Sequence, residues 1–578
     1  MNSGIRAFFS DLRKKRIVEI LAAFIGGGWL LVEVVERLLV GHYHLPERLI
    51  DLTVVSVVGA LLTTLVWRWF SGREKPRKLK LELILIPLVL LITVLLDINL
   101  LLHLRGPESD VIPATKWKNS IAVLPFVDMS PQKDQEYFCD GMTEELINRL
   151  SNIRELKVPA RTSAFYFKGK AQDIQKIGQK LKVNTVLEGS VRRAGNELRI
   201  TAQLVNIADG YHLWSQTYDR ELQDIFAFQD EISLEIINKL KIELLGEDRA
   251  RVVKRYTENT EAYDSYMRGQ WLLNNKVTAE DWRNALLYFE RAIEIDPKFS
   301  LAYVSLAEIH LSLAMWHFVS ADGAIPKAEQ ALENALAIDP RVPEALTWSG
   351  IIKYRFEYDW TGGESDIKKA LELNPNCGPA HNALSVILLT KKGDIDKGIE
   401  EIRATLELNP LSLRRQGDFA FYNYQVGRFD DALKQCQKTL EVDPEYPFIL
   451  ETLGLCYMQK SLFQDAIVAF QKAIAFSGNN TMYISYLAYA HAVSGNLEKA
   501  NEILRELNQL SEHVYVSKYY LAPIQAAIGD KDKAFELLEL AYKERDGDLI
   551  FLKGDPKFDV LRSDPRYKLM LKKIGLEK

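Results

Sequence analysis

The chain has 578 residues, of which 26% are charged and 47% hydrophobic, and its mean hydropathy is −0.11. This length exceeds what a single hydrophobic core supports, so several domains are expected. A net charge of −5 and a pI near 6.1 give no general reason to expect nucleic acid as a partner. Four cysteines in 66.0 kDa exclude a scaffold built on disulfides.

Three apolar runs crowd the first 104 residues, at positions 17–39, 52–70 and 83–104. Each run is close in length to the roughly 20 residues that cross a bilayer as a helix. The first run is too long for the apolar core of a cleaved signal peptide, so we expect it to be retained. The runs therefore predict three transmembrane helices, with two spans and a buried third segment as the alternative.

Basic residues predict how these helices are oriented. Residues 1–16 and the loop 71–80 each carry five basic side chains, whereas residues 41–50 carry one. Because basic loops stay in the cytoplasm, we expect a basic cytoplasmic N-terminus at 1–16 and all domains after residue 104 outside. The chain would then be a multi-pass protein of the bacterial inner membrane with periplasmic C-terminal domains.

Two acidic residues, Glu33 and Asp97, lie inside the first and third apolar runs. One interpretation is a paired, proton-sensitive site, because carboxylates inside a membrane span usually serve a function. The other is that both carboxylates reach the outer headgroups.

The periodicity changes after a linker at residues 105–118. Short apolar runs that predict buried strands alternate with two amphipathic helices, and three strands and a last helix complete the pattern. The strands are expected at 121–127, 156–159, 184–192, 198–205 and 211–218, and the helices at 135–153, 174–181 and 225–245. This order predicts an α+β domain over residues 119–246.

Long stretches of this region resemble a known family. They are IAVLPFVDMSPQKDQEYFCDGMTEELINRLSNI, VLEGSVRR and ELRITAQLVNIADGYHLWSQTYDREL. They resemble the TolB-N-terminal-like domain of bacterial membrane-anchored tetratricopeptide proteins, and FFSDLRKKRIVEILAAFIGGGWLLVEVVERLL is similar to the first membrane helix of that family. Some members also carry an adenylate/guanylate cyclase or a winged-helix DNA-binding domain. Because 16 residues precede the first run here, we expect neither, and the resemblance implies no catalytic residues.

The C-terminal half is expected to be a repeat array. Asp-Pro or Asn-Pro pairs recur with their prolines at 297, 340, 375, 410 and 444, at spacings of 43, 35, 35 and 34 residues. A period near 34 with helix–turn–helix content is typical of tetratricopeptide repeats, and such units bury their apolar faces only by stacking. We predict about eight repeats over residues 261–545 and a C-terminal cap at 546–578, so the fold class is an α+β domain followed by an all-α solenoid.

Motifs for catalysis or for phosphate, cofactor or metal binding are absent from the sequence. We therefore predict no enzyme, no cofactor and no metal. His310 and His317 lie two turns apart, and a packing role is favoured for both. Cys436 and Cys456 are expected on helices that pack together, where either a bridge or two buried thiols would fit.

A binding groove is the remaining prediction. In tetratricopeptide arrays the first helix of each repeat lines the concave face, and here its lining positions include Arg414, Phe421, Tyr424, Gln425, Phe448, Glu451, Leu455, Met458, Tyr489 and Tyr519. Aromatic and methionine side chains favour peptide binding, although some could instead seal one repeat against the next. The predicted groove is formed by Phe421, Tyr424, Leu455, Met458 and Tyr489.

Two classes of function fit this reading. The first is a membrane-anchored scaffold or receptor, which presents the TolB-like domain and the groove to a protein or peptide. The second is a signalling protein, whose spans relay an outside event to a cytoplasmic partner bound at residues 1–16 and 71–80. The oligomeric state and the identity of the partner do not follow from the sequence.

Overall fold

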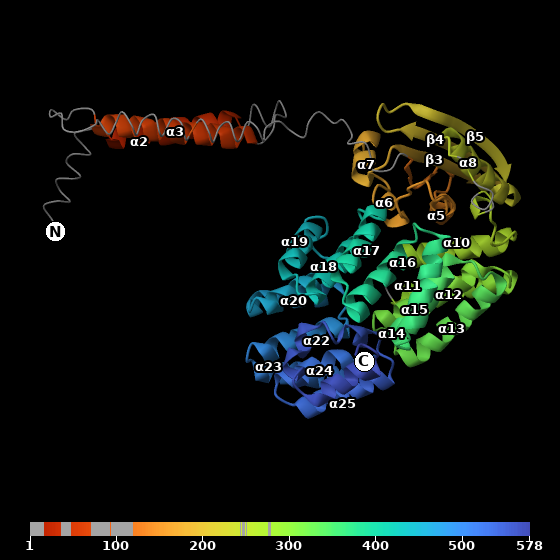
Figure 1. The fold of residues 1–578 in the computed structure, drawn as a ribbon. Coiled ribbons are helices and arrows are strands. Elements are labelled where there is room, and N and C mark those ends of the chain that lie inside the picture. The colour runs from red at the N-terminus through yellow and green to blue at the C-terminus, as the bar shows by residue number, and fades with distance from the viewer. Residues whose placement is uncertain are drawn as a thin grey trace. The chain divides into compact units, whose positions relative to one another are not determined.

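The computed structural model describes residues 17–35, 48–70, 93, 119–170, 172–242, 244, 249, 251–275 and 279–577. The chain divides into two compact units, Met1–Pro113 and Ala114–Lys578. In the first unit, α2 (Ile17–Val34) and α3 (Arg48–Phe70) pack side by side (Figure 1). A Cβ at position 59 of α3 would lie 2.3 Å from Oγ1 of Thr93, so a glycine is needed there for the close approach of Thr93.

The prediction of three transmembrane helices is wrong. Among the described residues, none of the helices combines the length and the apolarity that a bilayer crossing requires. Helix α2 has 18 residues, or about 27 Å at 1.5 Å per residue, which falls short of a ~30 Å hydrocarbon core. Helix α3 is longer, with 23 residues, but Arg48, Asp51 and Arg68 interrupt its apolar sequence. The third predicted span, 83–104, lies outside the described residues except for Thr93.

The predicted localisation is corrected together with the spans. A multi-pass inner-membrane protein with periplasmic C-terminal domains depended on three crossings, and these are not found in the described part of the chain. Glu33 lies half-buried in α2, whereas Asp97 and the basic segment 1–16 lie outside the described residues. The pairing of the two acids is therefore not tested by the described residues and stays a prediction.

The second unit begins with a mixed sheet in the strand order β1-β3-β4-β5, with β2 also paired to β3. Strands β1 and β2 run parallel to β3, whereas β3, β4 and β5 form an antiparallel meander. The strands are β1 (Ile121–Val123), β2 (Val127–Asp128), β3 (Thr185–Ala194), β4 (Glu197–Asn206) and β5 (His212–Glu221). The strand expected at 156–159 is reduced to a single bridge between Ser120 and Lys157.

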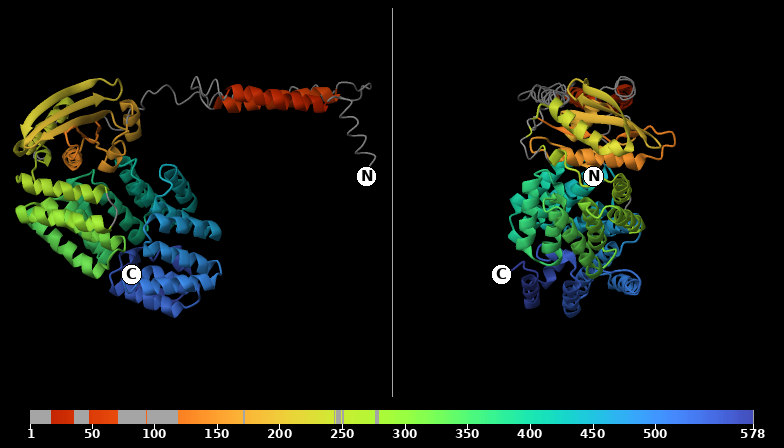
Figure 2. Two further views of the ribbon diagram at one scale, coloured as in Figure 1. Left: turned by 180° about the vertical axis from the view of Figure 1, so that it is seen from behind. Right: turned by 90° about the vertical axis from the view of Figure 1, so that its right-hand side faces the viewer.

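Helices cover one face of this sheet (Figure 2). The covering follows from the alternation in β4, where Leu198, Ile200, Ala202 and Leu204 are buried and the residues between them are not. These side chains share one hydrophobic core with the buried faces of two helices. The helices of this region are α5 (Glu136–Ser151), α6 (Arg161–Phe165), α7 (Ile174–Leu181), a 3-10 turn η2 (Leu222–Asp224) and α8 (Ile225–Lys239), of which α5 and α8 supply those faces.

Eight helix pairs follow within the described residues. The first helices of the pairs are α10 (Thr260–Asn275), α12 (Ser300–Met315), α14 (Pro343–Phe356), α16 (Gly378–Ile387), α18 (Leu413–Gln425), α20 (Pro447–Gln459), α22 (Thr481–Val493) and α24 (Lys518–Ala527). The second helices are α11 (Ala279–Ile295), α13 (Ala321–Ile338), α15 (Trp360–Leu373), α17 (Ile395–Leu408), α19 (Phe429–Leu440), α21 (Phe463–Phe476), α23 (Leu497–Leu510) and α25 (Lys531–Lys543). A π-helical turn, η3 (Leu388–Lys392), extends α16.

Small residues let the two helices of a pair approach each other. In the sixth pair, a Cβ at position 454 would lie 2.5 Å from the ring of Phe470, and in the first pair a Cβ at 269 would lie 2.7 Å from the ring of Phe289. Both phenylalanines are fully buried. The glycine of one helix thus makes room for the aromatic ring of the other, which is the packing that the repeat period predicts.

The array curves until late repeats meet early ones. Figure 1 shows the last repeats beside α14, which lies far from them in sequence. The Trp316 ring, just after α12, lies 6.2 Å from the Phe448 ring of α20, and Asn480 donates to the Trp316 carbonyl at 3.3 Å. The chain then ends in η4 (Gly547–Phe551), η5 (Pro556–Leu561) and α26 (Pro565–Lys573). The C-terminal cap returns to the early repeats, where Trp360 donates to the Ile574 carbonyl at 2.8 Å.

Candidate functional site

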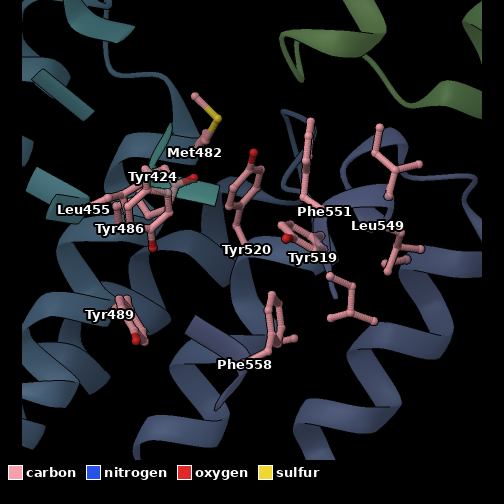
Figure 3. Close-up of a cluster of buried hydrophobic side chains, with 14 of the residues drawn as sticks. Tyr424, Leu455, Met482, Tyr486, Tyr489, Tyr519, Tyr520, Leu549, Phe551 and Phe558 are labelled. Atoms are coloured by element: carbon pink, nitrogen blue, oxygen red, sulfur yellow. The ribbon is translucent and has the colours of Figure 1, made fainter. Parts of the chain in front are cut away.

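The five predicted groove residues lie together, on the first helices of three consecutive pairs. Phe421 and Tyr424 belong to α18, Leu455 and Met458 to α20, and Tyr489 to α22. All five belong to, or pack against, one hydrophobic cluster, part of which Figure 3 shows. Tyr424 and Leu455 are fully buried, Met458 and Tyr489 are 7% and 8% exposed, and Phe421 is half-buried. The structure thus brings them together but does not leave them open to solvent.

The cover over these residues is the chain's own residues 546–561, here named the C-terminal segment. Its Phe551 ring meets the Phe421 ring edge-on, with centroids 5.3 Å apart. A Cβ at Gly554 would lie 2.9 Å from the Gln425 carbonyl oxygen, so the two backbones are in close contact. Leu549, Ile550, Leu552, Phe558 and Leu561 of the segment are fully buried. The concave face is therefore filled from within the molecule.

Asp548 is the main polar contact of the C-terminal segment. Arg355, at the end of α14, donates to one carboxylate oxygen at 2.5 Å. The other oxygen accepts from the Tyr520 hydroxyl of α24 at 2.5 Å and lies 2.9 Å from Nε2 of His317, which follows α12. Three separate repeats thus supply the partners of one carboxylate, and charge-assisted hydrogen bonds of this kind are the strong ones.

Two further aspartates fasten the segment. Asp546 accepts from the Ser517 hydroxyl at 2.5 Å and from the Asp548 backbone N–H at 3.0 Å. Asp555 accepts from the Tyr519 hydroxyl at 2.8 Å and from the Lys557 backbone N–H at 3.1 Å. Asp546 and Asp555 are the N-cap residues of η4 and η5. Each aspartate therefore fixes a local turn. Each also accepts a hydrogen bond from the array, from Ser517 or from Tyr519.

The charges in this cluster shift the pKa values of its members. Burial alone would raise the pKa of Asp548, but the Arg355 charge and the hydrogen bonds from His317 and Tyr520 hold it well below its usual range. Burial alone would lower the pKa of His317, but Asp548 and Asp546 outweigh burial and raise it. Asp546 has a raised pKa, chiefly because it is buried. The arrangement therefore favours an ionised Asp548 beside a protonated His317.

A metal centre is a weaker interpretation of the same residues. His317, Asp546 and Asp548 offer ligand atoms within 4.8 Å of one another, and all three residues are buried. However, the carboxylate oxygens of Asp548 already accept from Arg355 and Tyr520, and the guanidinium of Arg355 would repel a cation. The geometry is that of a hydrogen-bonded ion cluster, and we assign no metal to it.

Some buried polar atoms of the concave face lack hydrogen-bond partners within the described residues. They are the Tyr424 hydroxyl, both amide atoms of Gln425, one carboxylate oxygen of Glu451 and Nε of Arg355. Glu451 is 2% exposed and Gln425 8%, and burial raises the pKa of Glu451 to about 8 although the Lys557 charge opposes the shift. Because buried polar groups are almost always hydrogen-bonded, these atoms mark places where the C-terminal segment fits the array imperfectly.

A separate hollow of about 1150 Å³ lies on the α+β domain, between the sheet and the segment after α6. Its cationic side chains have partners: Lys168 lies 2.6 Å from carboxylate oxygens of both Glu136 and Asp140. The Lys170 ammonium lies 3.5 Å from the centre of the Tyr166 ring. Because these charges are already compensated, we assign no ligand to this hollow.

Sequence reasoning missed the residues that bind Asp548. The predicted lining positions included Gln425, Glu451 and Tyr519. They did not include Arg355 and His317, which bind Asp548. Arg355 is the thirteenth residue of α14, the first helix of the third repeat, and this helix position lines the concave face. Applying to the third repeat the helix positions used for the later repeats would therefore have identified Arg355. His317 follows the end of α12, where no helix position rule applies. All four cysteines, including Cys436 and Cys456, are free and buried.

Comparisons with known proteins agree with the repeat array. A tetratricopeptide repeat model matches residues 422–480. The model that matches residues 117–235 is described as the second domain of HilA/YgeH-like transcriptional regulators. The predicted TolB-N-terminal-like identity and the membrane anchoring of that family are therefore not supported.

Individual relatives cover parts of the chain. "Putative adenylate cyclase 3" of Rhizobium meliloti (strain 1021) is 40% identical over 247 residues, which are 41% of this chain and 41% of that protein. A repeat-containing protein of Bacillus subtilis (strain 168) is 21% identical over 338 residues, 55% of this chain and 77% of its own length. A solved tetratricopeptide protein of Thermus thermophilus is 21% identical, with a TM-score of 0.29, and covers 34% of this chain and 99% of its own. The chain thus spans about two fifths of the Rhizobium relative. The chain therefore contains tetratricopeptide repeats, because it is built from successive helix pairs and the repeat model matches residues 422–480.

Proposed function

We propose that this chain is a non-enzymatic interaction protein that binds a protein or peptide partner in the concave face of its repeat array. The binding surface would be formed by Phe421, Tyr424, Leu455, Met458 and Tyr489. A scaffold or receptor role of this kind needs no catalytic residue, and it uses the surface on which the first helices of successive repeats converge.

One observation carries this proposal: the concave face already holds a chain segment in the manner of a bound peptide. Phe551 of the C-terminal segment meets Phe421, and Asp548 is bound by side chains from three repeats. Aromatic contacts around a few directional polar contacts are what peptide grooves use. The unpaired atoms of Gln425 and Glu451 support the view that another chain could bind the same face.

Peptide selection tests the proposal. Peptides selected from a random displayed library against the full chain should bind less tightly, by tenfold or more, to Phe421→Ala. The matched control is Leu287→Ala, which removes an apolar side chain that is 63% exposed on α11. Binding that responds equally to both changes, or to neither, would place the binding surface elsewhere and contradict the proposal.

A further inference from the structure

We propose that the C-terminal segment is an intramolecular ligand of the concave face, and that the external partner is a peptide carrying the same repeated Asp-x-x-Phe pattern. This inference rests on the proposed function, and it adds the chemistry of the partner and the way in which the groove is controlled. The pattern occurs twice in the segment, as Asp548-Leu-Ile-Phe551 and as Asp555-Pro-Lys-Phe558.

The first argument is the geometry of the pattern. Residues three apart lie on the same side of a 3-10 helix, so the acid and the aromatic ring of η4 point in the same direction. Asp548 contacts Arg355, His317 and Tyr520, whereas Phe551 contacts Phe421.

The second copy begins seven residues further along the chain, and its acid is the N-cap of η5, whereas Asp548 lies inside η4. Asp555 accepts from the Tyr519 hydroxyl, and the Phe558 ring lies 5.1 Å from the Tyr519 ring. Each copy thus places one carboxylate on at least one donor of the array and one ring on its aromatic side chains, and Asp555 also pairs with Lys557 of the segment itself.

The second argument is that the array holds the carboxylate site in place. His317 is stacked with Tyr515, with ring centroids 6.2 Å apart, and meets Tyr520 edge-on at 5.2 Å. The Arg355 side chain is 17% exposed and pairs with Asp548, whereas the buried His317 has ligand atoms of both Asp546 and Asp548 within 4.8 Å. Without Asp548 the Arg355 guanidinium would lose this carboxylate, and a largely buried cation requires an acidic partner. The site therefore selects peptides that carry an aspartate or glutamate at this position.

The third argument is that the C-terminal segment binds by contacts that another peptide can replace. Its two helical turns are short 3-10 helices, whose own hydrogen bonds have poorer geometry than those of an α-helix. The Tyr424 hydroxyl, the Gln425 amide and a Glu451 oxygen stay unpaired beside it. A peptide that supplies donors and acceptors to these atoms would bind better than the chain's own segment and displace it.

The test uses the full chain and a fluorescent synthetic copy of residues 545–562 as the probe, with fluorescence anisotropy as the readout. Asp548→Ala weakens the internal ligand and leaves the array side chains intact, so the probe should bind this variant at least tenfold more tightly than it binds the unchanged chain. The control is Asp559→Ala, in the same segment, whose carboxylate is 60% exposed and forms an ion pair with Arg562. The affinity of this variant for the probe should equal that of the unchanged chain. A probe with asparagine at the position of Asp548 should bind at least tenfold more weakly.

Phe551→Ala is a second variant that weakens the binding of the internal ligand, and we call it and Asp548→Ala the loosening variants. Phe551→Ala removes a ring and leaves no charge unpaired. If both variants fold and neither binds the probe more tightly than the unchanged chain, the proposal is overturned. If both unfold the array, the segment is part of the core and the proposal is also overturned. If library peptides bind through Phe421 while the loosening variants do not change the affinity for the probe, the proposed groove is supported and only the proposal of an internal ligand is overturned. If neither the library peptides nor the probe bind, the proposed function itself fails.

Discussion

Glu451→Gln should change how the stability of the chain depends on pH. Glu451 lies on the concave face of α20, is 2% exposed, and has a pKa raised by burial from 4.5 to about 8. In the unfolded chain the group loses its proton near pH 4.5, whereas in the fold it keeps the proton up to about pH 8. The stability linked to this proton is therefore fully present below about pH 4.5 and is lost as the pH rises to about 8.

The magnitude follows from the two pKa values. At about 1.36 kcal/mol for each pKa unit, the free energy of unfolding should fall by roughly 4 kcal/mol between pH 5 and pH 9 through this group alone. Glutamine has nearly the same shape and does not titrate. Glu451→Gln should therefore match the unchanged chain at pH 5 and exceed its stability by roughly 4 kcal/mol at pH 9.

Urea unfolding of the full chain at pH 5, 7 and 9, followed by circular dichroism, measures this difference. The matched control is Glu502→Gln on α23, where the carboxylate is 47% exposed and paired with Lys499 at 2.8 Å. The control should follow the unchanged chain at every pH. If Glu451→Gln also runs parallel to the unchanged chain, Glu451 is ionised in the fold and the imperfect fit inferred around it is incorrect.

Four further substitutions at three positions test the packing, each by urea unfolding. Phe470→Ala should cost about 3–5 kcal/mol, because the ring is fully buried against Gly454 and stacks on Tyr486 at 5.5 Å; a cost below about 1 kcal/mol would contradict this packing. Gly454→Ala should cost about 1–3 kcal/mol through overpacking, since the new Cβ would lie 2.5 Å from that ring; an unchanged midpoint would show that the ring can move away. Tyr424→Phe should leave stability unchanged or slightly higher, because its hydroxyl has no partner among the described residues, whereas Tyr424→Ala should cost about 3–5 kcal/mol. A clear loss with Tyr424→Phe would mean that the hydroxyl is hydrogen-bonded.

The prediction for Tyr424 shows what the sequence could and could not provide. The helix position of Tyr424 follows from the repeat period, and the structure places it on the concave face with Leu455 and Tyr489. Its burial does not follow, because the segment that covers it lies more than a hundred residues further along the chain. A lining position in an open array would be exposed, whereas Tyr424 is fully buried beside Phe421, whose ring contacts Phe551.

Local patterns were sufficient elsewhere. The alternation from Leu198 to Leu204 predicts a half-buried strand, and β4 has that burial pattern. The prediction of membrane spans near the N-terminus was wrong because it used the apolar composition of the runs without the exact ends of the helices. In the structure, α2 ends at Val34 and α3 begins at Arg48. The ion cluster at Asp548 joins residues 231 positions apart, His317 and Asp548. No periodicity connects such positions, and only the curvature of the array brings them together.

Hydrogen–deuterium exchange on the full chain tests the central claim most directly. A ¹³C-labelled synthetic copy of residues 545–562, whose fragments differ in mass from those of the chain, is added in excess. If the concave face binds this peptide in place of the C-terminal segment, the amides of η4 and η5 should exchange faster while those of α18 and α20 stay protected. Unchanged protection of η4 and η5 at saturating peptide would contradict the account.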